Sequence, residues 1–375
     1  MNILVIAADI GITAQGIVYE TLIRELSKSA NITLITGSIR KGLDLKLPIC
    51  VIPSMHESNY RIENLLFSVF KRNFLDDLWL WKNTNKISKE LVQKHHIILS
   101  FISNHHYRAM LLADYLSQRD SIKWSLYSVD AIPAPIGWSK KSRFVHNTKS
   151  FIGSYIKKSP SFFSSNYQML AYQLFGLDYD GKTGVIYTPV RDVIRVDECK
   201  TEKSPIFLYT GGIYGPRRPE ALFEGFRLFL KKYPEAKLMF VGTSEYVLSK
   251  CEDLVELKKV ELYKHTHDLA PYYKKSTALL DINAYFENDV FLSSKVVNYL
   301  GVRRPIISIT GLNSPSRNIF TNDPTIIHCK HDANEICDAL CFTYEKQHWD
   351  WKERENYISL FSPENVIKEM LEVIK

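Results

Sequence analysis

The feature that most constrains this chain is a regular alternation of short apolar runs with amphipathic helical patterns, which starts at the first residue. One helical pattern carries Ile17, Leu22 and Leu26 on a single face. In the N-terminal half, the apolar runs span residues 2–8, 32–36, 97–102 and 123–129. Such alternation is typical of parallel sheets that are covered by helices on both faces. The sequence therefore predicts an α/β fold.

A second series of the same kind follows the polar run of residues 197–204, which we interpret as a domain boundary. Its apolar runs span residues 206–212, 237–242, 259–263, 277–282 and 305–309, with helical patterns at 219–232, 268–275 and 294–300. A chain of 375 residues also exceeds one ordinary core. We therefore expect an N-terminal domain over residues 1–190, a C-terminal domain over 191–360, and a last helix within 361–375 that packs back towards the N-terminal domain.

Two further segments carry weaker patterns. Residues 56–90 mix Trp, Phe and Leu with Lys and Arg, which predicts an amphipathic helical segment. Packing against the sheet is the favoured explanation, and contact with a membrane or an acceptor is the alternative. Residues 184–192 predict a strand with a proline near its end, just before the boundary.

Composition narrows the class of protein. Hydrophobic residues make up 45% of the chain and charged ones 24%, as in soluble globular proteins, and the six cysteines show no metal-binding spacing, as expected of reduced thiols in the cytoplasm. No apolar stretch approaches the roughly 18 residues that span a bilayer, so contact with an anionic inner membrane would be peripheral. The net charge of +7 favours anionic partners. Nucleic acid is not expected among them, because no binding module for it is recognisable.

The most informative motif runs from residue 209 to residue 234. A buried strand ends in Gly211 and Gly212, and Arg217 and Arg218 then open a helix, from which they are expected to project. Glycines let a ligand approach the backbone, and a helix N-terminus with two arginines attracts a diphosphate. An isolated arginine pair would be interpreted as solvated surface charge, but the order of strand, glycines, arginines and helix favours a diphosphate site.

The second motif is a short helix between a loop and a buried strand. Ser293 and Ser294 are candidate N-caps whose amides would face an anion, and Gly301 is the candidate C-cap. Lys295 and Asn298 lie three residues apart and share a helical face. They would contact the ribose or phosphate of a nucleotide from one side of a cleft. The simpler interpretation is an ordinary helix whose polar residues face water.

Together the two motifs resemble the C-terminal domain of GT-B-fold glycosyltransferases, in particular the large retaining family that includes many bacterial polysaccharide and lipopolysaccharide transferases. The segment SKVVNYLGVRRP is similar to that family's pattern Ser-Lys-x-x-Glu-Tyr-Leu-x-x-Gly-x-Pro through Lys295, Tyr299, Leu300 and Pro305. The resemblance implies two Rossmann-like parallel-sheet domains facing across a cleft, with the donor held mainly by the C-terminal one. Asn298 departs from the pattern, because the family places there a glutamate that binds the donor ribose.

The same resemblance implies roles for other residues. Arg217 matches the basic residue that binds the donor diphosphate. Glu287, or Asp289 in the same loop, matches the glutamate near the transferred sugar. His265 and His267 occupy the place where the family lines the nucleotide base and ribose, although histidines in such loops more often cap the backbone or face solvent.

The function implied by the resemblance is the transfer of a sugar from a nucleotide-diphosphate donor to a glycan or lipid-linked acceptor. Retention of configuration and a pathway of surface polysaccharide synthesis, such as capsule or lipopolysaccharide, are expected with it. The protein would work in the cytoplasm, in peripheral contact with the inner face of the cell membrane. No cofactor and no metal are expected, and we interpret the triplet Asp178-Tyr179-Asp180 as a turn rather than a metal site.

The N-terminal loop of residues 8–20, between the first strand and the first helix, contains Gly11, Gln15 and Gly16. In the family such a loop approaches the donor phosphate and the acceptor. The glycine pattern is an incomplete dinucleotide fingerprint, which disfavours a dinucleotide-dependent dehydrogenase.

Asp130 and the histidine pair His105 and His106 follow later strands of the same half. Asp130 is a candidate catalytic residue that would orient or deprotonate an acceptor hydroxyl, and a turn-capping aspartate is the equally weighted alternative. Adjacent histidines point in different directions, so His105 or His106, but not both, is expected on the acceptor side.

Two other classes of protein stay open. A nucleotide-sugar epimerase shares the architecture but would need acid and base side chains in the cleft, and the second motif argues against it. A catalytically silent partner subunit with the same fold is suggested by Asn298 and by the irregular loop around Glu287.

Overall fold

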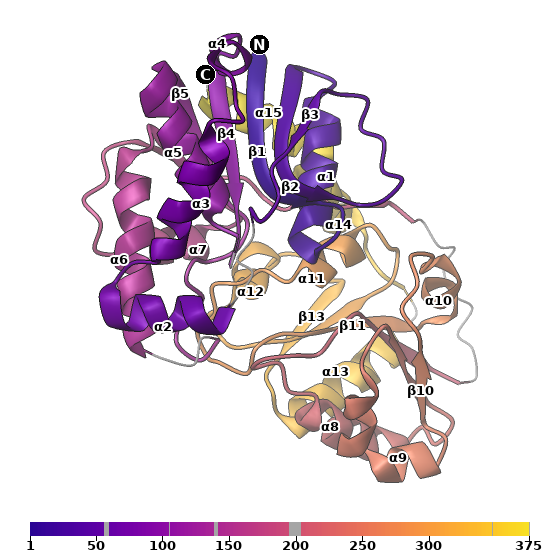
Figure 1. Cartoon of the computed structure of the whole chain (residues 1–375). Coiled ribbons are helices and arrows are strands. Elements are labelled where there is room, and N and C mark those ends of the chain that lie inside the picture. Colours follow the sequence, from indigo (N-terminus) through magenta and orange to yellow (C-terminus); the bar gives the residue numbers. More distant parts are fainter. Residues whose placement is uncertain (56–59, 105, 139–141, 195–203, 347, 375) are drawn as a thin grey trace. The chain divides into compact units, whose positions relative to one another are not determined.

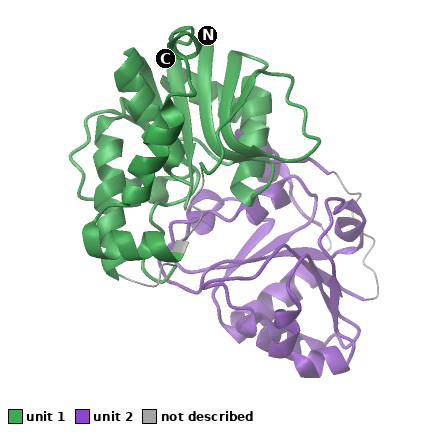
Figure 2. Ribbon diagram, viewed as in Figure 1, with its two compact units in different colours: residues 1–189, 363–375 green, residues 190–362 purple. Residues whose placement is uncertain are grey.

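The computed structural model of the chain, shown in Figure 1, describes residues 1–55, 60–104, 106–138, 142–194, 204–346 and 348–374. The chain forms two compact units. Unit 1 comprises Met1–Pro189 and Pro363–Lys375, and unit 2 comprises Val190–Ser362 (Figure 2). Each unit is a parallel sheet with its own helices and its own hydrophobic core.

Unit 1 is built on a seven-stranded sheet of order β3-β2-β1-β4-β5-β6-β7, in which every pairing is parallel. The chain starts in the middle of the sheet, runs to one edge, and then returns to β4 on the other side of β1. The strands are β1 (Asn2–Ile10), β2 (Asn31–Ile39), β3 (Ile49–Val51), β4 (Ile97–Ile102), β5 (Lys123–Ser128), β6 (Ser161–Ser164) and β7 (Lys182–Val185).

Helices cover both faces of this sheet, because successive side chains of a strand point to opposite sides. Leu4 and Ile6 of β1 belong to one core cluster, and Ile3 and Val5 belong to the other. The helices are α1 (Ala14–Leu26), α2 (Tyr60–Phe70), α3 (Phe74–Thr84), α4 (Lys89–Gln93), α5 (Arg108–Asp120), α6 (Ser142–Lys158), α7 (Tyr167–Leu174) and α15 (Pro363–Ile374). The last of these packs against α1 and against β7.

Unit 2 repeats the same plan with a six-stranded, all-parallel sheet of order β10-β9-β8-β11-β12-β13. Its strands are β8 (Ile206–Thr210), β9 (Lys237–Val241), β10 (Val260–Tyr263), β11 (Ala278–Ile282), β12 (Ile306–Ile309) and β13 (Ile326–Cys329). Its helices are α8 (Glu220–Leu230), the 3-10 helix η1 (Glu245–Lys250), α9 (Glu252–Glu256), α10 (Ala270–Lys275), α11 (Ser294–Leu300), α12 (Pro315–Ile319), α13 (Ala333–Glu345) and α14 (Lys352–Leu360).

Most of the expected strands and helices are confirmed, and three expectations need correction. The loop expected over residues 8–20 is short, because β1 continues to Ile10 and α1 already begins at Ala14. The helical segment expected over 56–90 is three helices, since the side chains of Asn73 and Ser88 cap the starts of α3 and α4.

The third correction concerns residues 184–192, which were expected to form a strand. β7 ends at Val185, and the N–H of Val190 donates to the carbonyl of Phe361 rather than to a strand of the sheet. Pro189 has no N–H to offer a ladder. The polar run of residues 197–204 lies outside the described residues, apart from Ser204.

Candidate functional site

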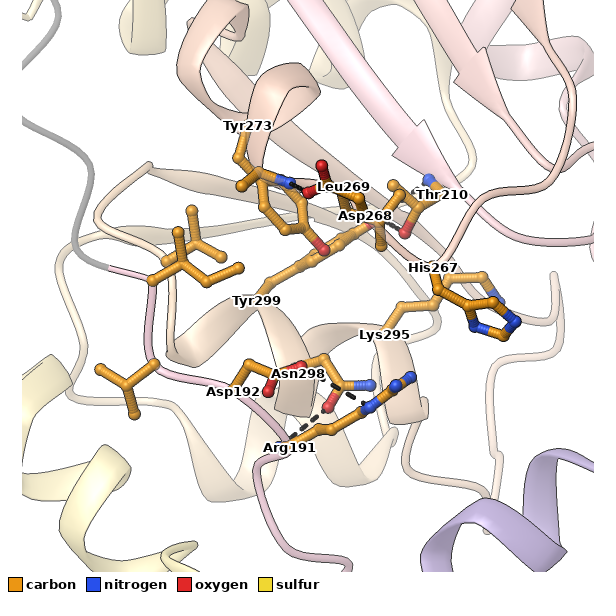
Figure 3. Close-up of a pocket in the computed structure, with 14 residues that line it drawn as sticks. Arg191, Asp192, Thr210, His267, Asp268, Leu269, Tyr273, Lys295, Asn298 and Tyr299 are labelled. Carbon is orange, nitrogen blue, oxygen red and sulfur yellow. Dashed lines mark hydrogen bonds and ion pairs between the residues drawn. The ribbon is translucent and has the colours of Figure 1, made fainter. Parts of the chain in front are cut away.

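A cavity of about 410 Å³ opens in unit 2 beside α11. Its walls come from the start of the unit, the end of β8, the segment around α10, and α11 itself, as Figure 3 shows. The lining residues are Arg191, Asp192, Val193, Ile194, Thr210, His267, Asp268, Leu269, Ala270, Tyr273, Lys295, Asn298, Tyr299 and Val302. Cavities of about 300–1,000 Å³ with a few polar groups hold small ligands in other proteins.

The cavity changes character along α11. Lys295 lies in the first turn of the helix, Asn298 lies one turn later, and Val302 follows the helix end. At 1.5 Å per residue, these positions extend about 10 Å along the helix axis. Val302 pairs with Ile194 across a short parallel bridge, so the far end of the cavity is apolar while the near end carries an ammonium group.

Lys295 reaches its position because Gly211 leaves room for it. Gly211 has a φ of +90°, and a Cβ built on it would lie 3.1 Å from Cε of Lys295. The ammonium nitrogen lies 5.3 Å from the centre of the Tyr209 ring. Burial lowers the pKa of Lys295 to about 7, with a further lowering by the Arg217 guanidinium, while the Asp281 carboxylate opposes both.

Arg217 is not among the residues that line the cavity, and it does not project from the start of α8 as expected. It lies three residues before that helix, its backbone forms a bridge with Ala284, and its guanidinium lies 4.7 Å from the centre of the Tyr214 ring. The position is partly buried and close enough to Lys295 for the two cations to repel each other. An anion with more than one negative charge would relieve this repulsion.

Asp281 is an acidic residue that the sequence analysis overlooked. It lies on β11, and it has no exposed surface. Its Oδ2 accepts from Asn283 Nδ2 at 2.7 Å and from the Ser308 hydroxyl at 3.3 Å. A buried carboxylate beside two basic residues partly balances their charge, and it leaves a net positive site of Arg217 and Lys295.

Asn298 does not offer its oxygen to the cavity. The side-chain Oδ1 accepts the backbone N–H of Arg191 at 3.2 Å, which ties the start of unit 2 to α11 (Figure 3). Gly301 supports the same contact, because a Cβ there would lie 2.1 Å from the carbonyl oxygen of Asp192. Gly301 is the C-cap of α11 as expected, but with a right-handed φ of −68°. The glycine is therefore required for packing rather than for a left-handed cap.

Tyrosines and a loop form the opposite wall. The Tyr299 hydroxyl accepts the N–H of Thr210 at 3.0 Å, which anchors α11 to the end of β8. His267 and Tyr273 line the cavity from the segment after β10. His265 does not line it, because its side chain lies against Gly242 and against the His267 ring at 5.1 Å.

The other predicted residues of the C-terminal half lie outside the cavity lining. Gly212 accepts the Tyr209 hydroxyl through its carbonyl at 2.9 Å. The Arg218 guanidinium lies 4.2 Å from the centre of the exposed Tyr285 ring. Ser294 is exposed at the start of α11, where Ser293 is the residue that caps the helix by accepting the N–H of Lys295.

The loop before α11 contains Glu287 and Asp289, the two candidates for the acidic residue near the transferred sugar, and they lie in different environments. Glu287 is exposed, and its carbonyl accepts the N–H of Asn313. Asp289 is buried, and its Oδ1 accepts the N–H groups of Val290 at 2.8 Å and Phe291 at 3.3 Å. Asp289 therefore shapes the loop, while Glu287 keeps an accessible carboxylate.

In unit 1, predicted residues gather where β1 and β5 end. Gln15 Nε2 donates to Asp130 Oδ2 at 2.7 Å, which joins two residues that are 115 positions apart in sequence. Asp9, which the sequence analysis missed, accepts from the Thr13 hydroxyl at 2.8 Å, and its Oδ2 lies 3.6 Å from Nδ1 of His106. The predicted His105 lies outside the described residues.

The two predicted glycines of this region serve the packing of the turn. A Cβ on Gly16 would lie 1.8 Å from Oδ1 of Asp9, so a larger residue would displace that carboxylate. Gly11 directly follows β1, and its N–H donates to the carbonyl of Gly16 at 2.8 Å. Their contacts explain both glycines without a phosphate ligand.

Two properties of the described part of the chain bear on the class of protein. Within it, no helix combines the length and the apolar character that crossing a bilayer requires. Among the same residues, no cluster of three or more histidine, cysteine or acidic side chains has the arrangement of a metal site.

Solved structures with the same fold extend over the whole chain. HepE of Anabaena, in complex with UDP and glucose, has a TM-score of 0.70 at 10% identity, over 100% of this chain and 99% of its own. The lipopolysaccharide outer core galactosyltransferase WaaB, in its apo form, has a TM-score of 0.65 at 16% identity, over 100% and 99% of the two chains. Sucrose-phosphate synthase from Thermosynechococcus elongatus has a TM-score of 0.62 at 13% identity, over 100% and 98%. No protein-family model and no curated protein sequence matches the chain.

The chain therefore has the GT-B fold of these glycosyltransferases, with two parallel-sheet units of Rossmann-like strand order. At identities this low the likeness defines the fold, and the activity has to be argued from the site itself.

Proposed function

We propose that the protein is a glycosyltransferase that takes a sugar from a nucleoside-diphosphate donor and passes it to a glycan or lipid-linked acceptor. The observation that carries the proposal is the cavity along α11, with its cationic end at Lys295 and its apolar end at Val302 and Ile194. A nucleoside diphosphate has the matching polarity, because its base is flat and mostly apolar while its diphosphate is strongly anionic.

In this proposal Lys295 and Arg217 bind the diphosphate of the donor. The same two cations stabilise the negative charge that develops on the leaving diphosphate during transfer. Basic side chains then supply the charge stabilisation that a divalent cation supplies in other enzymes, so we expect transfer to proceed in the presence of a chelator. HepE, which shares the fold, has been solved with UDP and with UDP-glucose, and these are therefore the first donors to test.

Asp130 is proposed to orient the acceptor hydroxyl or to take its proton. Its carboxylate is held by Gln15 at 2.7 Å, and the residue follows β5 at the carboxyl edge of the sheet of unit 1. Ligands of open α/β sheets bind at that edge. We propose retention of configuration, as in the family that the two motifs resemble, with Glu287 near the transferred sugar.

A lipid-linked acceptor would bring the protein to a membrane surface, and α2 and α3 of unit 1 suit such contact. Leu65 is 61% exposed, Phe70 57% and Trp81 71%, and they share these helices with the exposed basic residues Arg61 and Lys82. Exposed aromatic and aliphatic residues interspersed with cations are typical of helices that bind anionic lipid surfaces. We propose peripheral binding at the inner face of the cell membrane, in a pathway of surface polysaccharide synthesis.

The first experiment measures thermal stabilisation by UDP, GDP, ADP and CDP, because a ligand of the folded state raises its stability by mass action. Arg217→Ala should weaken the binding of the best nucleotide far more than Lys231→Ala, which removes an exposed charge at the other end of α8. Equal effects of the two substitutions would mean that Arg217 is surface charge. No stabilisation by any of the nucleotides would contradict the proposed function.

A second experiment tests the reaction. The protein is incubated with nucleotide sugars, a bacterial lipid extract and a chelator, and both the released nucleoside diphosphate and the product are measured. Acceptor-dependent transfer with the anomeric configuration of the donor is the expected result. Conversion of the donor to an epimeric sugar nucleotide would instead identify an epimerase, and binding without any turnover would favour a silent subunit.

The membrane contact has its own test, which is sedimentation with vesicles of phosphatidylglycerol or of phosphatidylcholine. We expect binding to the anionic vesicles and its loss in Trp81→Ser. Tyr246→Ser removes an equally exposed aromatic residue from unit 2 and should leave binding unchanged. If both variants bind like the wild type, α2 and α3 do not form the membrane surface.

A further inference from the structure

The ribose of a nucleoside diphosphate needs a hydrogen-bond acceptor on the wall of its cavity. Which residue supplies this acceptor is a question that rests on the proposed function. The two ribose hydroxyls are neighbouring donors, and a carboxylate binds such a pair well because it has two acceptor oxygens and a full charge. The position within α11 where a carboxylate would be expected from the resemblance carries Asn298.

Two neutral acceptors of the lining are already engaged. The Asn298 oxygen already accepts the N–H of Arg191, and as a neutral acceptor it binds a hydroxyl group less strongly than a carboxylate does. The Thr210 hydroxyl lies 2.9 Å from the Tyr299 hydroxyl, and these two groups share a hydrogen bond. The strongest acceptors available to the ribose are therefore the carboxylates on other parts of the wall.

Two carboxylates belong to the described lining of the cavity, and they differ in their contacts. Oδ1 of Asp268 accepts the N–H of Ala270 at 3.2 Å, close to the start of α10. Asp192 lies on the opposite wall, beside Asn298 (Figure 3). The Asp192 side chain is 65% exposed, and its Oδ2 lies 3.6 Å from Nε of Arg191.

The backbone around Asp192 is fixed to α11 on both sides. Before it, the N–H of Arg191 donates to Asn298, and after it the N–H of Ile194 donates to the carbonyl of Gly301 at 2.7 Å. Ile194 also forms the bridge with Val302. A carboxylate on a backbone segment held in this way loses little further freedom when it binds a ligand.

We propose that Asp192 is the residue that binds the ribose hydroxyls of the nucleoside-diphosphate donor. Asn298 is then a positioning residue, whose side-chain oxygen holds the Asp192 segment against α11 through the N–H of Arg191. The carboxylate that the family places on the helix is replaced by one from the neighbouring segment. The order of contacts along α11 becomes diphosphate at Lys295, ribose at Asp192 and Asn298, and base towards Val302.

The test compares the affinity of UDP with that of dideoxy-UDP, which lacks both ribose hydroxyls. If GDP or ADP is the better ligand in the thermal experiment, it is compared with its own dideoxy form. The wild type should prefer the ribonucleotide about tenfold or more, as expected for the loss of hydrogen bonds to a charged group. Asp192→Asn, which keeps an oxygen but removes its charge, should reduce that preference severalfold and leave the affinity for the dideoxy form unchanged.

Two variants separate the ribose contact from other effects. Asp268→Asn removes the other carboxylate of the lining, lowers the local negative charge equally, and should keep the preference of the wild type. Adding Asn298→Glu to Asp192→Asn places a carboxylate on the same wall and should restore at least part of the preference. Unchanged affinity for the dideoxy form shows in each variant that the cavity is intact.

The outcomes distinguish this inference from the proposed function. If the wild type binds nucleoside diphosphates and Asp192→Asn keeps the full preference for the ribonucleotide, only the role of Asp192 is overturned. Loss of the preference in Asp268→Asn would transfer the role to Asp268. A wild type that binds none of the nucleotides would overturn both the proposed function and the inference.

Discussion

The two units of this protein share a strand order, but they carry opposite charge at the point where that order reverses, beside the first strand of each sheet. In unit 1 this point lies between β1 and β4, where Asp9 is near the end of β1 and Asp130 and His106 follow β5 and β4. In unit 2 the same point lies between β8 and β11, and the groups gathered around it are Arg217 and Lys295. One topology thus supports an acidic site and a basic site.

In the proposed function, this difference assigns separate parts of the reaction to the two sheets. A sheet edge with fixed carboxylates suits the orientation and deprotonation of hydroxyl groups, and an edge with fixed cations suits a diphosphate. In both units the charged side chains depend on neighbours far away in sequence, since Gln15 donates to Asp130 and Gly211 leaves room for Lys295. The difference in charge therefore comes from side chains near the strand ends, while the strand order of the two sheets is the same.

The largest expected effect is that of Asp130→Asn on transfer. Loss of a general base typically costs about a hundredfold to ten-thousandfold in rate. The kcat should fall within that range, while the dissociation constant of UDP measured by calorimetry stays unchanged, because the proposed donor site belongs to unit 2. Asp178→Asn, which changes an exposed aspartate of the same unit, is the matched control and should have wild-type kcat. If Asp130→Asn lowers the affinity for UDP as much as it lowers kcat, the two units do not have the separate roles proposed for them.

Lys295→Met tests the basic site in the same way. A charge-assisted hydrogen bond contributes about 1.5–3 kcal/mol, so the affinity for UDP should fall about 10- to 150-fold. Unit 1 should be unaffected, and the variant should unfold near the wild-type temperature or above it, since a desolvated charge has been removed. Lys250→Met removes an exposed lysine of unit 2 and should change nothing. Wild-type affinity in Lys295→Met would show that the cavity does not hold the diphosphate.

The pH dependence of donor binding sharpens the same comparison. The pKa of Lys295 is lowered to about 7 by burial in the empty site, and a bound diphosphate would raise it. Below that pH the lysine is already protonated, and above it binding must take up a proton. The affinity for UDP should therefore fall as the pH rises above about 7, by at most about tenfold per pH unit.

Proton uptake can be measured directly by calorimetry in buffers of different ionisation enthalpy. Lys295→Arg keeps the charge at every pH used and should remove the dependence. Binding that is equally strong across this range in the wild type would mean that Lys295 is protonated in the empty site or makes no contact with the ligand.

The sequence predicts the part of the candidate site that lies on one helix, but not the contacts between distant segments. The sequence predicts α11 over residues 294–300 and places Lys295 and Asn298 on one face, because a helical period fixes neighbours three and four positions apart. It does not predict the contact between Gln15 and Asp130, since nothing in the local pattern shows which strand ends lie side by side.

Three other residues show where the sequence pattern fails. Asp281 lies inside the apolar run of residues 277–282, and Asp9 directly follows the run of residues 2–8. Only the sheet order reveals that each lies close to a residue of a proposed site. Asp192 was expected in a strand of residues 184–192, where alternation would assign it a side of the sheet. Its actual orientation is set by hydrogen bonds of the flanking residues to α11, a contact between segments about 100 residues apart.

The smallest expected effect is that of Gln15→Ala, which removes the support of Asp130 and leaves the carboxylate in place. The lost hydrogen bond to a surface-accessible group contributes about 0.5–1.5 kcal/mol, so kcat should fall about two- to tenfold while the affinity for UDP is unchanged. The chain contains a matched control in Gln118, whose side chain donates to Asp114 at 2.9 Å within α5. Gln118→Ala removes a hydrogen bond of the same chemistry and should leave kcat at the wild-type value. If both variants lose activity equally, the loss reflects stability, and Asp130 does not depend on Gln15 for its orientation.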